Sequence, residues 1–286
     1  MLAALVLVTA CRTEDEPPAP EGRDGADDSA EPVPAGDPAY LEGDEGVSEV
    51  RAWFLHANEP DLWVAPGTVH LDAPTTSPLD AAIDGVISGR PGNPEAARRL
   101  APPGTRLLGV DLDAGVATVD LSGFAMPAER TASEEQAFAQ QLAHTATQFH
   151  DVDAVRLHVR GQAVAELWGH LDWSEPQTAD PGALAPVIVE SPRWAAVQPA
   201  GSVTASGSLA AAGSTVQLRL IDPTGTVVEE ASTTASEEDV GGRGRWEHAF
   251  ETEAVTPGRW AVGAAELEAP AERAPFRMVV RFAIEG

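Results

Sequence analysis

The sequence predicts two folded modules in series, an α+β two-layer sandwich followed by an all-β sandwich. Two observations support this prediction. Between residues 47 and 173, segments of alternating hydrophobicity are interleaved with two segments of helical period, whereas residues 187–286 hold only short alternating segments separated by turns. The length agrees with this division, since 286 residues correspond to about two domains at roughly 150 residues each.

The chain is strongly acidic, with 45 aspartates and glutamates against 18 arginines and no lysine, which gives a net charge of −27. This charge argues against a nucleic-acid partner, because phosphate binding requires a basic surface. It also argues against docking on anionic lipid through basic clusters. The single cysteine excludes an internal disulfide and a cysteine-based zinc site. We predict no cofactor and no metal.

An apolar run at residues 2–10 ends directly before the only cysteine, Cys11. Nine residues span about 14 Å as a helix, whereas a bilayer core of about 30 Å requires roughly 20 residues. The run therefore has the length of a signal-peptide core and not of a transmembrane helix. No basic residue precedes it, and the alternative is a buried N-terminal strand with a core cysteine.

The residues Val8-Thr9-Ala10-Cys11 resemble the lipobox of bacterial lipoproteins. This resemblance implies that residues 1–11 are a lipoprotein signal peptide with its lipidation site, and that Cys11 carries a lipid after residues 1–10 are removed. The mature protein would then be anchored to the cell membrane on its extracytoplasmic face, where two or more acyl chains give stable attachment.

Residues 12–46 have the composition of a disordered tether. They carry twelve acidic residues against Arg12 and Arg23, a net charge of −10, and many prolines and glycines. Such a segment buries too little apolar area to offset the conformational entropy lost on folding. A flexible chain of this length has a root-mean-square reach of about 30–35 Å. The tether would therefore hold the folded modules away from the membrane.

The first module, residues 47–173, is predicted to contain strands and two helices that pack one apolar stripe each onto one sheet. Because each helix has only one apolar stripe, the sequence argues against a doubly wound sheet. In chain order, the expected elements are strands at 47–57 and 62–71, a helix from Pro78 to Gly89, a hairpin at 105–122, a helix from Ser133 to His150 and a strand at 155–159.

Local signals refine the ends of these elements. Ser77 is a plausible N-cap before Pro78, and Gly89 ends the first helix. Ser133 with Gln136 fits a capping box for the second helix. Pro66-Gly67 predicts a turn or bend within the second strand.

Five phrases of the first module resemble the GerMN domain of sporulation and spore-germination lipoproteins. They cover about 120 residues in order: Leu79-Asp80-Ala81-Ala82-Ile83 with Gly89, Pro103-Gly104-Thr105-Arg106-Leu107, Val116–Ser122, Gln141–Phe149, and Asp153–Leu157 with Gly161-Gln162. His144 stands where tyrosine is commoner in the family. The resemblance implies an envelope interaction module without catalytic residues.

A linker rich in Pro, Gly and Asp at residues 174–186 leads to the second module, residues 187–286. Seven short alternating strands over about 100 residues predict a β-sandwich of immunoglobulin-like type, with Trp246 or Trp260 filling a core that has no disulfide. Three phrases resemble the immunoglobulin-like domain fused to GerMN in spore-germination proteins: Glu190-Ser191-Pro192-Arg193, Gly201–Gly207 and Pro257-Gly258-Arg259-Trp260.

Three residue groups are candidates for chemistry. The histidines and aspartates at His144, His150, Asp151, Asp153 and His158 are the densest group, but His144 and His150 lie on different faces of one helix, so no zinc site is predicted. The carboxylates of Asp111, Asp113 and Asp120 on the hairpin could serve a glycosidase, although alternation places Asp111 on the outer face. Among four tryptophans that flank strands, one or two on a rim would suit a partner or glycan surface: Trp53, Trp63, Trp168 and Trp173.

We therefore expect a non-enzymatic, membrane-anchored lipoprotein that binds cell-envelope proteins or peptidoglycan. Its role would lie in envelope assembly, signalling or sporulation and germination. Self-association through sheet edges is a further possibility. The alternative is a cell-wall glycan hydrolase that uses the hairpin carboxylates, and a solute-binding lipoprotein is disfavoured because two small modules lack paired large lobes.

The lipid anchor has a direct test. Cells that express the wild-type chain should incorporate a fatty-acid analogue into it, whereas Cys11→Ala should incorporate none, because the substitution removes the thiol that carries the lipid. Equal label in both proteins would contradict the anchor.

Overall fold

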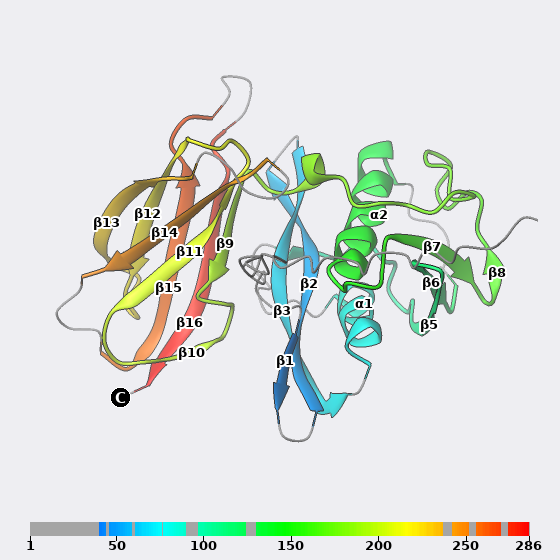
Figure 1. Cartoon of the computed structure of the whole chain (residues 1–286), viewed down its shortest axis with the longest axis horizontal. Helices are drawn as coiled ribbons and strands as arrows, with labels where there is room; N and C mark the ends of the chain where they lie inside the picture. Colours follow the sequence, from blue (N-terminus) through cyan, green and yellow to red (C-terminus); the bar gives the residue numbers. More distant parts are fainter. Residues whose placement is uncertain are drawn as a thin grey trace, which may run out of the picture. The chain divides into compact units, whose positions relative to one another are not determined.

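The first module holds two helices between two separate sheets (Figure 1). We describe it from a computed structural model, and the residues that the structure describes are 40–43, 46–58, 61–75, 77–89, 97–123, 130–236, 242–251, 256–269 and 274–285. Cys11 lies outside these residues, as does most of the predicted tether.

The first sheet is antiparallel and is dominated by one long hairpin of β2 (Gly46–Asn58) and β3 (Asp61–Thr75). Two short strands, β1 (Tyr40–Gly43) and β4 (Ala97–Arg98), also pair with β2. Strand β1 lies inside the range 12–46 that was expected to be disordered, so regular structure begins before the predicted end of the tether.

No turn forms at Pro66-Gly67, because β3 continues through both residues, which pair with Trp53 and Ala52 of β2. Gly67 faces Phe54 on β2, and a Cβ at Gly67 would lie only 2.7 Å from Cδ2 of that ring. The glycine therefore makes room for an aromatic side chain across the strand pair and does not turn the chain.

Helix α1 (Pro78–Ser88) ends as predicted, at Gly89 in the left-handed region with φ of 66°. At its other end, the Ser77 side chain makes no capping hydrogen bond. Asp80 in the first turn instead accepts a hydrogen bond of 3.2 Å from the backbone N–H of Val110, which ties the helix to the second sheet.

Helix α2 (Ala132–Thr147) begins with a capping box, but at Thr131 and Glu134 and not at the predicted Ser133 and Gln136. The Thr131 hydroxyl accepts from the N–H of Glu134, and the Glu134 carboxylate accepts from the N–H of Thr131. Both pairs fit the motif, and the pair with a carboxylate is favoured because a charged acceptor makes the stronger hydrogen bond.

The second sheet has the order β5-β6-β7-β8. Its strands are β5 (Leu107–Asp113), β6 (Val116–Leu121), β7 (Ala154–Val159) and β8 (Gln162–Ala163). The predicted hairpin of β5 and β6 is confirmed, and α2 is the crossover between the parallel strands β6 and β7. Leu108 and Leu112 are 54% and 43% exposed because β5 is the edge strand of this sheet.

The helices contact both sheets, which the single apolar stripe of each did not predict. In α2 the stripe with Phe138 and Leu142 is buried, and so is a second row that contains Ala139, Ala143 and Ala146. These alanines let the backbone of α2 approach a sheet closely. Because their side chains are small, the sequence pattern did not indicate a second buried face. The predicted α+β class is confirmed, with the strands divided between two sheets.

The second module is an all-β sandwich, as predicted (Figure 1). Its five-stranded sheet has the order β10-β16-β15-β12-β13 and its three-stranded sheet the order β14-β11-β9. The strands are β9 (Val187–Ser191), β10 (Val197–Pro199), β11 (Val203–Leu209), β12 (Thr215–Ile221), β13 (Val227–Thr234), β14 (Gly244–Phe250), β15 (Gly258–Glu266) and β16 (Arg277–Glu285). Only the three-residue β10 lies outside the seven expected strands.

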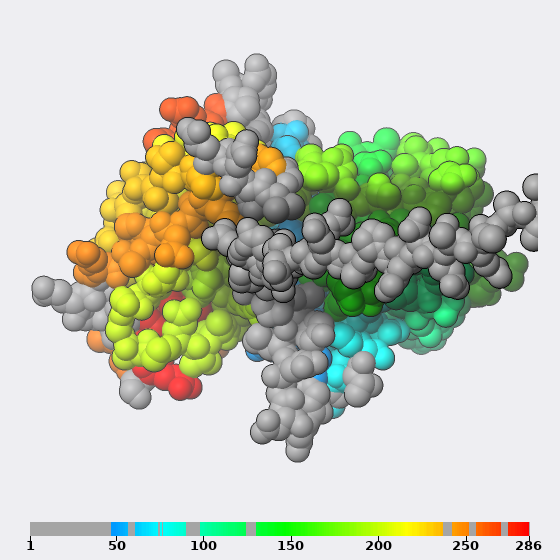
Figure 2. Space-filling model, viewed as in Figure 1, coloured from blue at the N-terminus to red at the C-terminus, as the bar shows by residue number. Residues whose placement is uncertain are grey.

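Both tryptophans proposed for the core of this sandwich, Trp246 and Trp260, are buried there. The chain packs tightly around them, and Gly207 on β11 leaves no space for a Cβ because the carbonyl oxygen of Ile188 and the Trp246 ring occupy that position. Each module appears in Figure 2 as a close-packed block of its own colours.

The two modules share a packed junction within one compact unit, residues 37–286. Ala65 on β3 belongs to the apolar cluster of the second module, and Trp53 and Trp63 pack against that cluster. The sheet of β2 and β3 is therefore covered by helices and by the second module, which explains why both faces of these strands are apolar.

Gly207→Ala should lower the free energy of unfolding by about 1–3 kcal/mol, because the added methyl group overpacks the space beside Trp246. Gly109→Ala is the matched control, since a Cβ there meets nothing within 4 Å. Denaturant unfolding measures both. Equal midpoints for the two variants would contradict the packing account.

Candidate binding cleft beside the linker

The hairpin carboxylates do not converge on a reaction centre. Asp111 and Asp113 are exposed on β5, on the face of the sheet opposite the buried side chains of β6. Asp120 is engaged elsewhere, because its Oδ1 accepts a 3.0 Å hydrogen bond from the N–H of Gly161. This bond stabilises the turn between β7 and β8.

The histidine and aspartate group is dispersed in the same way. His150 pairs with its neighbour Asp151 at 2.9 Å, and both side chains are exposed. His144 is buried on α2 and faces the linker. Within the described part of the chain, no three His, Cys, Asp or Glu side chains lie close enough to hold a metal ion.

Of the four tryptophans considered for a rim, Trp173 is instead fully buried. Its Nε1 donates a 2.9 Å hydrogen bond to Glu135, which also accepts from the backbone N–H groups of Trp168 and His170. Glu135 is a completely buried carboxylate on α2, and it binds three residues of the segment that follows β8. Sequence reasoning missed this residue because charged groups usually occupy the solvent face of a helix.

The linker is held to the first module and does not form a free spacer. Gln140 on α2 donates from Nε2 to the carbonyl of Thr178 at 3.1 Å and accepts at Oε1 from the N–H of Asp180 at 2.7 Å. His144, one turn further along α2, has its Nε2 2.9 Å from the carbonyl oxygen of Asp180. We call residues 174–186 the strap.

The end of the strap is fixed by the second module as well. The N–H of Ala185 donates to the carbonyl of Val64 on β3 at 2.8 Å. Arg243, a buried side chain of the second module, donates to the carbonyl of Ala185 at 2.8 Å and to the Ser208 hydroxyl at 3.1 Å. Burial lowers the pKa of Arg243 to about 10, so it stays charged at neutral pH.

A cleft of about 320 Å³ opens where the strap, α2 and the start of β3 meet. The short helix η1 (Pro181–Ala183) forms one wall. The cleft is lined by one indole, two amides, two carboxylates, a hydroxyl and small or apolar groups: Asp61, Leu62, Trp63, Ser133, Gln136, Ala137, Gln140, Asp180, Gly182 and Ala183. We call this the Trp63 cleft.

The Trp63 cleft combines one apolar surface with fixed polar groups. Trp63 is half-buried, and Gln136 and Ser133 are exposed at the first turns of α2. Gln140 is positioned by its hydrogen bonds to Asp180 and Thr178, and the carboxylate of Asp180 also accepts from the N–H of Gly182. This arrangement can bind a small polar ligand with a flat apolar face, and its volume lies in the range of ligand sites.

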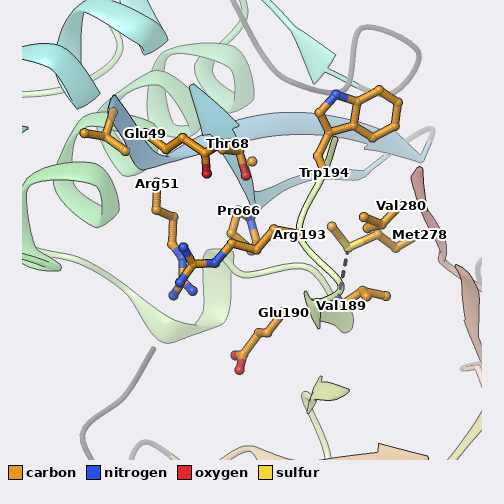
Figure 3. Close-up of a pocket in the computed structure, with 12 residues that line it drawn as sticks. Glu49, Arg51, Pro66, Thr68, Val189, Glu190, Arg193, Trp194, Met278 and Val280 are labelled. Atoms are coloured by element: carbon orange, nitrogen blue, oxygen red, sulfur yellow. Dashed lines mark hydrogen bonds between the residues drawn. The ribbon is translucent and has the colours of Figure 1, made fainter. Parts of the chain in front are cut away.

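A second cavity lies at the junction of the modules (Figure 3). It is lined by Pro66 and Thr68 from β3 and by Trp194, Met278 and Val280 from the second module, and the N–H of Val189 donates to Sδ of Met278. Its volume of about 30 Å³ accommodates about one water molecule. The cavity is therefore part of the packing and too small for a ligand.

Two buried histidines accompany this junction. His56 on β2 lies 6.4 Å from the Phe276 ring of the second module, and burial lowers its pKa to about 4. The ring of His144 lies 5.3 Å from that of Trp53, and burial also lowers its pKa. Both imidazoles are therefore neutral at pH 7.

No helix among the described residues is both long enough and apolar enough to cross a bilayer.

Each module matches one known family. Residues 54–165 match the family described as sporulation and spore germination, Germane. Residues 186–270 match the family described as immunoglobulin-like domain of bacterial spore germination, Gmad2. No curated protein matches the chain.

Solved structures with similarity include the first GerMN domain of the sporulation protein GerM from Bacillus subtilis, with 22% identity and a TM-score of 0.33 over 48% of this chain and 97% of that one. The tandem GerMN domains of the same protein give 16% identity and a TM-score of 0.38 over 72% and 62% of the two chains. A candidate lipoprotein from Clostridium perfringens gives 23% identity and a TM-score of 0.32 over 45% and 85%.

Burial of His56 predicts a specific pH dependence of stability. Its pKa is about 4 in the folded protein and about 6.5 in the unfolded chain, so between these values the unfolded chain binds more protons. The free energy of unfolding should therefore fall as the pH is lowered from 6.5 towards 4, by up to about 1.4 kcal/mol per pH unit from this group.

Denaturant unfolding at several pH values measures this dependence as a difference between variants. The slope of the free energy of unfolding against pH reports how many more protons the unfolded chain binds than the folded protein. His56→Leu should reduce this difference by about one proton, whatever the absolute stability of the variant. His150→Gln, at an exposed imidazole, is the control. If His56→Leu and wild type have the same slope between pH 4 and 6.5, the buried neutral state of His56 is wrong.

Proposed function

Because the chain carries a Germane domain followed by a Gmad2 immunoglobulin-like domain, we propose that it is a lipid-anchored, extracytoplasmic binding protein that holds cell-wall glycan in the Trp63 cleft. Both family descriptions refer to sporulation or spore germination, and the protein would act in such a process or in a related step of envelope assembly or signalling. Its role is to bind and position, and not to catalyse.

The Trp63 cleft is the observation that carries this proposal. A sugar ring has C–H groups on one face, which pack against an indole, and hydroxyl groups on its edge, which bind amides and carboxylates. The cleft supplies this combination, with Trp63 beside Gln136, Asp61 and Asp180. Its volume of about 320 Å³ suits one sugar ring with its substituents.

The strap makes the cleft suitable for tight binding. The side chains of Gln140 and His144 and the carbonyl of Val64 hold the strap between Thr178 and Ala185. A site whose polar groups are already in place loses less conformational freedom when a ligand binds, and this raises affinity. The net charge of −27 also favours a neutral or mixed-charge glycan over an anionic one.

The anchor is proposed from the N-terminal residues. The apolar run before Cys11 and the acidic composition of residues 12–39 support a lipid anchor followed by a spacer. In this arrangement the cleft would meet the cell wall at a distance from the membrane, since like charges separate the chain from anionic lipid.

Binding of a disaccharide–tetrapeptide fragment of peptidoglycan to the full chain in detergent tests the proposal. Calorimetry should show binding by wild type and at least a fivefold weaker affinity for Gln136→Ala, because the exposed amide at the cleft is lost. Gln162→Ala removes another exposed glutamine, on β8, and is the matched control. Trp63→Leu should weaken binding further, with folding verified by circular dichroism.

Two outcomes would contradict the proposal. Equal affinity of Gln136→Ala and Gln162→Ala would show that the glycan does not occupy the Trp63 cleft. Release of cleaved fragments by the purified chain, lost in Asp111→Asn or Asp120→Asn, would identify a hydrolase and not a binding protein.

A further inference from the structure

The outer face of the five-stranded sheet in the second module is basic, although the chain as a whole is acidic. Alternation along the strands places these side chains away from the sandwich core, whose side of the sheet carries Trp260, Val280 and Phe282. The charged residues on the outer face are Arg219, Arg259, Arg277, Arg281, Glu230 and Glu285. Within the described strands, four arginines against two glutamates give this face a charge of +2 on a chain of −27.

A groove of about 130 Å³ lies in this face, with Gly263 and Ala265 of β15 at its floor. Arg219 and Ile221 of β12 line one side, and Arg277 and Val279 of β16 line the other. Arg219 also pairs with Glu230 on β13, with Nε 2.8 Å from the carboxylate. The groove is therefore bordered by a cation and an apolar group on each side.

The glycine at the floor of the groove is not required by the fold. Its φ is not in the left-handed region, and a Cβ at Gly263 would meet Arg219, Ile221 and Val279 only at 3.9–4.0 Å, which is ordinary contact. A glycine inside a strand weakens the strand, and one reason to keep it is the close approach of another chain or a ligand. At Gly207, by contrast, Ile188 and Trp246 leave no room for a side chain, and this explains why the position holds a glycine.

Exposed apolar groups accompany the arginines on this face. Val279 is 37% exposed and Val197, on the neighbouring strand β10, is 56% exposed. Among the residues that the structure describes, no aromatic side chain lines the groove, so these residues offer a sugar no flat apolar platform. The groove therefore differs in chemistry from the Trp63 cleft.

We propose that this face binds an extended, acidic peptide segment of a partner protein, with an apolar side chain of that segment seated over Gly263. The guanidinium groups of Arg277 and Arg219 would bind carboxylates of the segment, since arginine recognises a carboxylate with two parallel hydrogen bonds. Ile221 and Val279 would contact the apolar side chain. This inference is independent of glycan binding in the Trp63 cleft.

Fluorescence anisotropy of the full chain in detergent tests the groove with a labelled twelve-residue peptide in which glutamate alternates with leucine. Arg277→Gln should weaken binding about tenfold, because it removes an exposed charge from the groove. Gly263→Leu should weaken it as much by filling the floor, with its fold verified by circular dichroism. Arg106→Gln, at an exposed arginine of the first module, should bind as wild type does.

The probe set separates a peptide site from a simple charge effect. A peptide with glutamine in place of glutamate and a polyglutamate of equal length should each bind at least tenfold more weakly than the alternating peptide. Equal binding of polyglutamate or polyphosphate would overturn the proposal in favour of a non-specific anion surface. Equal affinity of Arg277→Gln and Arg106→Gln would overturn the location.

Discussion

Burial of the β2–β3 hairpin on both of its faces is the constraint on which the rest of this structure depends. The two helices cover this sheet, and Ala65, Trp53 and Trp63 contact the apolar cluster of the second module. Without the second module, apolar side chains that now lie at the junction would be exposed to water, which a monomeric surface rarely permits. The two modules are thus structurally coupled and not merely linked.

This coupling turns the linker into part of a site. A flexible linker of thirteen residues rich in Pro, Gly and Asp would only set the distance between the modules. The strap is instead held in place by hydrogen bonds to Gln140, His144 and Arg243. The polar groups at Asp180 and Gly182 are consequently fixed beside Trp63, where they form a wall of the cleft. The Trp63 cleft therefore exists because the strap is ordered.

Predictions of helix ends and strands from the sequence were correct where they depended on interactions between neighbouring residues. Gly89 ended its helix as expected, and all seven predicted strands of the second module are present. They failed where two local solutions competed or where a partner was distant. Thr131 and Glu134 were preferred over Ser133 and Gln136 as the cap, and Gly67 serves the Phe54 ring and not a turn.

From the sequence alone one can derive the acidic surface, the two modules, their fold classes and their family resemblance, because composition, periodicity and short motifs are properties of neighbouring residues. Only the tertiary structure decided that α2 is covered on all sides from Ala137 to Ala146, that Glu135 is a buried hydrogen-bond centre and that Trp63 lines a cleft. The physical reason is that burial depends on which surfaces meet across long separations in the chain. The sequence around the buried alanines of α2 and around Glu135 does not indicate which distant residues they contact.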